Sequence, residues 1–77
     1  MMIKELDVVV LVKDLKEHHL KRGDVGTVVH IYADGTAFEV EFMIGDGKTI
    51  AVATLDAHDI RPMREMDILH VRAYAST

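Results

Sequence analysis

Residues 27–43 read TVVHIYADGTAFEVEFM, and this stretch decides the fold. Its second half alternates strictly between apolar and acidic residues, which is the period-two pattern of a strand with one buried face. The Asp-Gly dipeptide at 34–35 is a strong short-range signal for a hairpin turn. We therefore predict one strand over 27–32, a tight turn, and a second strand over 37–43.

The alternation also predicts which side chains of the second strand are buried. Phe38, Val40 and Phe42 should point into a core, because every second residue of a strand lies on the same face. Glu39 and Glu41 should then point to water from the opposite face.

Three further strands are predicted on either side of this hairpin. Residues 8–12 form an uninterrupted β-branched run, which is typical of a strand packed on both faces. Residues 48–55 follow a glycine turn, and residues 60–63 form a short last strand. Pro62 places this last strand at an edge, because proline has no N–H to donate to a ladder.

The connections are predicted from their composition. Residues 13–22 are charged apart from Leu15 and Leu20, so we expect one helical turn or an irregular loop pinned by these two leucines. The Gly-Asp-Val-Gly sequence at 23–26 predicts a turn, with the second glycine bending the chain sharply. Residues 56–59 predict a single tight turn of 3₁₀ type.

Five short strands separated by turn signals predict an all-β protein, a small antiparallel SH3-like barrel over residues 1–63. Residues 64–77 form a C-terminal extension with its own apolar pattern. A strand and a short helix are both compatible with it, and Ile68 and Val71 favour the strand. This extension is expected to cover an open edge or to pair with another chain.

The composition narrows the possible functions. The chain has 77 residues and no cysteine, which excludes disulfides, thiolate nucleophiles and thiolate-ligated metals. A domain of this size has a marginal core, so support from a partner chain is expected. The longest apolar run has about five residues against the ~20 that span a bilayer, and the N-terminus does not resemble a secretory signal. We expect a cytoplasmic protein without a membrane partner.

Catalysis, metal binding and cofactor binding are not expected. The five histidines are scattered over distant segments, so a zinc site would require them to converge by folding. The Glu39–Glu41 pair lies on an outward strand face rather than in a cleft, where acid–base chemistry would need it. No phosphate-binding loop or dinucleotide fingerprint is present. The histidines are His18, His19, His30, His58 and His70.

The glycine-rich stretch resembles a known signature. Residues 20–29 are similar to the KOW-type, SH3-like barrel motif, in which a glycine turn leads into Gly-x-Val. Over nearly its whole length the chain resembles the bacterial domain-of-unknown-function 4926 family. The resemblance implies an SH3-like fold and a bacterial origin, and members of that family look like the smaller partner in toxin–antitoxin-like gene pairs. The resemblance to this family rests on residues 3–7, 23–29, 38–42, 59–62 and 68–72.

The first functional hypothesis is a non-enzymatic protein-binding module, the antitoxin-like or immunity-like partner of a basic toxin-like protein. From Ala33 to Ile60 there are six acidic residues and one lysine, a local charge of −5 that suits a basic partner. The apolar extension offers strand pairing, and nearby methionines offer adaptable contacts. The expected partner-binding residues are Glu39, Glu41, Asp46, Ile68, His70 and Arg72.

Two alternatives remain open at this stage. A KOW-like RNA- or ribosome-associated module would use the basic loop residues Lys13, Lys16, Lys21 and Arg22. The overall charge of −4 and the scarcity of exposed aromatic residues weigh against nucleic acid. The second alternative is a homodimer formed through the extension, with no other partner.

Overall fold

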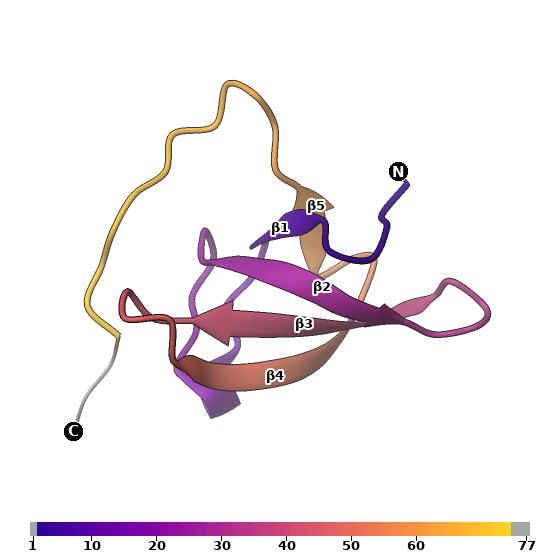
Figure 1. The fold of residues 1–77 in the computed structure, drawn as a ribbon, viewed down its shortest axis with the longest axis horizontal. Helices are drawn as coiled ribbons and strands as arrows, with labels where there is room; N and C mark the ends of the chain where they lie inside the picture. Colours follow the sequence, from indigo (N-terminus) through magenta and orange to yellow (C-terminus); the bar gives the residue numbers. More distant parts are fainter. Residues whose placement is uncertain (1, 75–77) are drawn as a thin grey trace.

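The computed structural model describes residues 2–74 as one antiparallel five-stranded sheet (Figure 1). The strand order is β4-β3-β2-β1-β5, and a single 3₁₀ turn, η1, is the only helical element of the described residues. The predicted all-β class with five antiparallel strands is confirmed. The elements are β1 (Val8–Leu11), η1 (Lys16–His18), β2 (Val25–Ile31), β3 (Ala37–Met43), β4 (Thr49–Asp56) and β5 (Ile60–Pro62).

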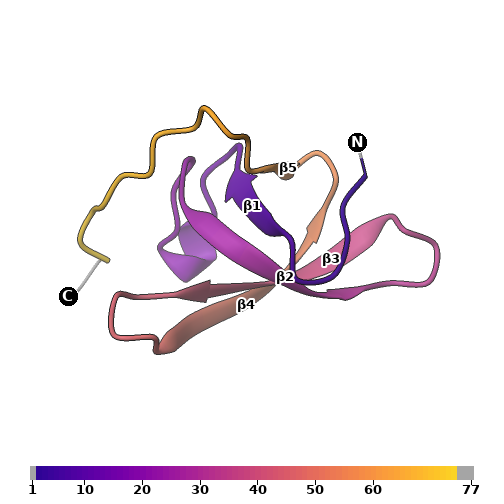
Figure 2. The same cartoon turned by 45° about the horizontal axis from the view of Figure 1, so that its top comes forward.

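The sheet is open rather than closed by hydrogen bonds into a barrel. β4 and β5 lie at its two ends, and within residues 2–74 no ladder joins them. β2 connects the two halves, because its first residues pair with β1 and the rest pairs with β3. A register shift between Val28 and His30 lies within the part of β2 that pairs with β3, and Figure 2 shows β1 running beside the first part of β2.

The core lies on one face of this twisted sheet. Phe38, Val40 and Phe42 of β3 are buried, as the alternation predicts, while Glu39 and Glu41 face outward and are half-buried. Each strand contributes at least one side chain to the same cluster, and the loop after β1 adds two leucines. The cluster comprises Val9, Leu11, Leu15, Leu20, Val28, Phe38, Val40, Phe42, Ala53, Leu55 and Ile60.

From Val9 to Leu11, β1 is buried on both faces, as predicted from its apolar run, whereas Val8 at its start is 42% exposed. Val9 and Leu11 belong to the core cluster. Val10 is buried as well but does not belong to that cluster, and it lines a small cavity together with Ile68 and Leu69 of the C-terminal extension. The extension therefore shelters the second face of β1 that the sheet leaves open.

The predicted role of Gly26 is wrong. β2 begins at Val25, so the turn is shorter than expected, and Gly23 rather than Gly26 takes a positive φ, +94°. Gly26 lies inside the strand, where an added Cβ would be 2.7 Å from Cγ1 of Val40 and 2.8 Å from Cε1 of Phe42. Its missing side chain lets β2 approach the core side chains of β3, which is a packing requirement rather than a bend.

The loop after β1 has the predicted form. η1 provides its single helical turn, and Leu15 and Leu20 pair with each other and are both buried. The tight turn predicted over 56–59 is also present, closed by the Asp59 amide donating to the Asp56 carbonyl at 3.0 Å.

The C-terminal extension forms neither the strand nor the helix that the sequence allowed, as far as Tyr74. The one backbone hydrogen bond within residues 64–74 runs from the Asp67 amide to the Arg64 carbonyl. The chain instead arches away from β5 and returns toward η1 (Figure 1). Polar side-chain contacts with the sheet and loops hold the extension in place of a strand ladder. We call residues 64–74 of the extension the strap.

Candidate functional site

The strap begins at a charge pair with β5. The Arg61 guanidinium donates to both carboxylate oxygens of Asp67, at 2.8 and 3.2 Å. Asp67 also accepts the Arg64 amide at 2.7 Å. The hydrogen bond from Arg61 lowers the pKa of Asp67, and the same pair raises the pKa of Arg61. We call this Arg61–Asp67 pair the first clamp, and it fixes the point at which the chain leaves the sheet.

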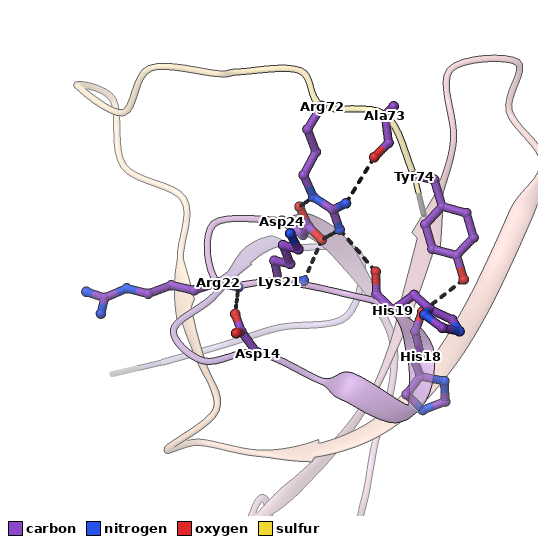
Figure 3. A network of polar contacts seen from close by, with 9 residues as sticks. All are labelled: Asp14, His18, His19, Lys21, Arg22, Asp24, Arg72, Ala73 and Tyr74. Carbon is purple, nitrogen blue, oxygen red and sulfur yellow. Dashed lines mark hydrogen bonds and ion pairs between the residues drawn. The ribbon is translucent and has the colours of Figure 1, made fainter. Parts of the chain in front are cut away.

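A second charge pair holds the far end of the strap. Arg72 Nε donates to Asp24 Oδ1 at 2.8 Å, and its Nη2 atom donates both to Asp24 Oδ2 and to the His19 carbonyl (Figure 3). Asp24 also accepts the Lys21 amide at 2.8 Å. Burial alone would raise the pKa of Asp24, but the hydrogen bonds from Arg72 and Lys21 hold it below its usual value.

Tyr74 extends this second clamp to η1. Its hydroxyl donates to the His18 carbonyl at 2.9 Å, and its ring meets the His19 ring edge-on with centroids 6.4 Å apart. Tyr74 also packs against the core cluster. The strap is therefore joined at both ends to the folded body, although it contains no regular secondary structure.

From Met66 to Val71, on either side of Asp67, the strap exposes its large apolar side chains. Met66 is 91% exposed, and Ile68, Leu69 and Val71 are 88%, 72% and 97% exposed. The polar and aromatic residues on either side of Val71 face the body instead. Several large apolar residues exposed side by side are typical of an interaction site, whereas single ones are common on any surface.

A groove lies between the end of the strap and the β3–β4 hairpin. Its volume is about 500 Å³, and its walls are mainly apolar. Phe42 and Met43 line it from β3, Ile50 from β4, and His70 and Arg72 from the strap. The predicted residues His70 and Arg72 thus form one wall of this groove.

The structure distributes the six predicted partner-binding residues over three places. Ile68, His70 and Arg72 lie in the strap, but the Arg72 guanidinium is occupied by Asp24. Asp46 lies at the tip of the β3–β4 hairpin, next to the groove residue Gly45, and accepts the Lys48 amide. Strap and hairpin therefore flank the same groove.

The remaining two, Glu39 and Glu41, lie on the outer face of β3 and do not meet the strap. Glu39 accepts hydrogen bonds from the Tyr32 hydroxyl at 3.0 Å and from the Thr54 hydroxyl, and Glu41 accepts one from the Thr49 hydroxyl. The bond to Glu39 raises the pKa of Tyr32. Hydrogen bonds from β4 and from Tyr32, the residue after β2, thus hold both carboxylates of this acidic surface in place.

The basic residues of the nucleic-acid alternative lie in the loop after β1, but one is neutralised. Lys13 Nζ lies 3.3 Å from Asp59 Oδ1. Asp14 lies in the same loop and accepts the Arg22 amide, while the Arg22 side chain points away from Asp24 (Figure 3). Lys16 and Lys21 are exposed. Acidic partners inside and beside this loop reduce the positive charge that a phosphate backbone would meet.

The residues that hold the strap were missed by the sequence analysis. Asp24 was expected to be a turn residue only, and Arg61, Asp67 and Tyr74 were given no role. Asp24 and Arg72 are 48 residues apart in the chain, so no local spacing rule connects them. Only the Arg61–Asp67 pair had a local signal, because its opposite charges are six residues apart, on either side of the proline that ends β5.

The described part of the chain contains neither a metal-ligating cluster nor a membrane-spanning helix. Within residues 2–74, no group of three or more histidine, cysteine or acidic residues could hold a metal ion. No helix in that range is long and apolar enough to cross a membrane.

The chain belongs to the family described as Domain of unknown function (DUF4926), whose model matches residues 5–62. The match spans all five strands and ends with β5, so the strap lies outside it. The stretch 68–72, on which the resemblance was also based, therefore has no counterpart in the matched region. No curated protein and no solved structure matches the chain.

Proposed function

We propose that this protein is a non-enzymatic binding module of the bacterial cytoplasm that neutralises a basic, toxin-like protein. The observation that carries the proposal is the clamped strap, which holds Ile68, Leu69 and Val71 in water between two Arg–Asp pairs. Apolar side chains of this size normally collapse onto a core. Here the clamps fix the backbone while the apolar groups stay exposed.

A fixed strap suits binding better than a free tail. A disordered segment that binds loses conformational freedom at that moment, which reduces its affinity. The Arg61–Asp67 and Arg72–Asp24 pairs already restrict the strap before a partner arrives. The partner would therefore gain the burial of apolar surface at a lower entropic cost.

The charge distribution supports a basic partner. Asp59 is the one acid of the Ala33–Ile60 segment that forms a salt bridge within residues 2–74, with Lys13. Glu39, Glu41 and Asp46 form no salt bridge there and accept hydrogen bonds from hydroxyl or amide groups only. Such an acidic surface accelerates encounter with a basic protein and disfavours polyanions.

The test is capture of the partner with a single-site control. Tagged wild-type protein should retain a stoichiometric basic protein from its host, and Ile68→Asp should reduce this retention at least ~10-fold, because a charge in an apolar contact is costly. Met2→Asp is the matched control, since Met2 is also exposed, at 80%, but lies outside the strap. The captured protein should arrest growth when it is expressed alone and not when it is co-expressed with the wild type. Equal retention by wild type and Ile68→Asp would refute the proposal.

A further inference from the structure

β4 ends the sheet with an unpaired edge. Its eight residues, Thr49–Asp56, pair with β3 on one side only, and both views show the strand at the outer margin of the sheet (Figures 1 and 2). Apart from that ladder, the only backbone hydrogen bond of β4 within residues 2–74 is the turn bond between Asp59 and Asp56. The second row of amide and carbonyl groups therefore has no backbone partner in this part of the chain.

The two edges of the sheet differ in how they are protected. β5 is three residues long, contains Pro62 and carries the clamp of the strap at Arg61, and each of these features discourages pairing with another strand. β4 has no proline and no charged residue from Thr49 to Leu55. Its one irregularity is a register shift close to Ile50, at the start of the strand.

The charges that flank β4 indicate what can pair with it. Lys48 precedes the strand and Asp56 ends it, and Lys48 forms no salt bridge with any residue from 2 to 74. Antiparallel pairing of two identical edges brings the start of each strand against the end of the other. Lys48 of each copy would then lie near Asp56 of the other, whereas parallel pairing would oppose like charges.

We propose that β4 pairs antiparallel with β4 of a second copy of this chain, so that the two sheets join into one. Val52, which is 49% exposed on the outer face of the strand, would contribute an apolar contact near the two-fold axis. We choose a second copy as the partner because Lys48 and Asp56, at the two ends of the strand, are complementary in charge. The residues between them carry no charge that would repel the same strand of another copy. This interface does not use the strap and shares only Ile50 with the groove, so it does not depend on the proposed function.

Sedimentation-velocity measurements over a range of protein concentrations test this pairing. The wild type should show a monomer–dimer equilibrium. Lys48→Asp and Asp56→Lys should each weaken dimerisation at least ~10-fold, because each homodimer then opposes two pairs of like charges. An equimolar mixture of the two variants should dimerise like the wild type, because both contacts of the mixed dimer again join opposite charges.

A second pair of variants separates pairing from folding, since Asp56 also accepts the His58 amide within its turn. Val52→Lys places a charge on the edge and should abolish the dimer, whereas Val29→Lys changes a similarly exposed valine of β2, inside the sheet, and should leave it intact. Circular dichroism should show folded protein in both. A wild type that stays monomeric at all concentrations, or a mixture that stays monomeric, would overturn the proposal.

Discussion

The sheet and the strap of this protein are stabilised by different interactions. In the sheet and the loop after β1, twelve apolar side chains are buried to 7% exposure or less, and no buried polar side-chain atom of the described residues lacks a partner. In the strap, the large apolar residues are 72% to 97% exposed, and two Arg–Asp pairs and a tyrosine hold the chain in place. Burial of apolar surface is the stronger of these effects. The sheet should therefore fold without the strap, and the strap should be releasable without unfolding the sheet.

The largest expected effect is a loss of core volume in the sheet. Phe42 is 2% exposed in the centre of the core, so Phe42→Ala should lower the free energy of unfolding by about 3–5 kcal/mol. Urea titration followed by circular dichroism would measure this change. Such a loss is a large fraction of the stability expected for a domain of this size.

The neighbouring residue provides the matched control. Met43 is 52% exposed, and Met43→Ala should change the free energy of unfolding by less than about 0.5 kcal/mol. Similar losses for both variants would mean that the core is not where the sheet places it. Burial of apolar side chains would then not be what distinguishes the sheet from the strap.

A smaller effect is expected when the clamp at the end of the strap is removed. Arg72→Ala should lower the free energy of unfolding by about 1 kcal/mol or less, since partly exposed ion pairs contribute little. The local effect should be clear: amide relaxation by NMR should show increased motion from residue 68 to 74, with β1–β5 unchanged. Asp24 keeps its bond to the Lys21 amide in this variant.

Arg22→Ala is the control for charge. It removes the same positive charge from the neighbouring loop, but the Arg22 side chain points away from Asp24 (Figure 3). Its strap should relax like that of the wild type. An equally mobile strap in both variants would show that net charge, rather than the clamp, restrains it.

The smallest effect on the strap is expected when the pH is lowered. The pKa values of Asp24 and Asp67 both lie below their ordinary values in the folded protein, so their contribution is complete above the unfolded pKa of about 3.9. It is lost as the pH falls through the lower, folded values. His70 acts on Asp24 in the same direction as Arg72, because its positive charge favours the carboxylate. Chemical shifts of the Arg72 Nε–H group should change in this acid range while the core signals persist.

Asp24→Asn tests the assignment of this transition. The variant has no titrating carboxyl at position 24, so the acid shift of the Arg72 signal should disappear. A shift that persists in the variant would assign the transition to another group.

The elements of the sheet were predictable because each has a local cause. The alternation of β3 gave its exact bounds and its buried face, and the β-branched run of β1 indicated burial on both sides. The edge position of β5 followed from Pro62, whose nitrogen cannot donate. Gly26 was misjudged because its role depends on Val40 and Phe42, which belong to a different strand.

By itself, the sequence determined that this chain forms five short antiparallel strands, which side chains of β3 are buried and where its negative charge is concentrated. Periodicity and turn chemistry act over a few residues, so they can be recognised without coordinates. The tertiary structure alone decided the course of residues 64–74 and the pairing of Arg72 with Asp24. Those contacts join groups that are distant in the chain and depend on where the folded sheet and loops place them, which no local pattern records.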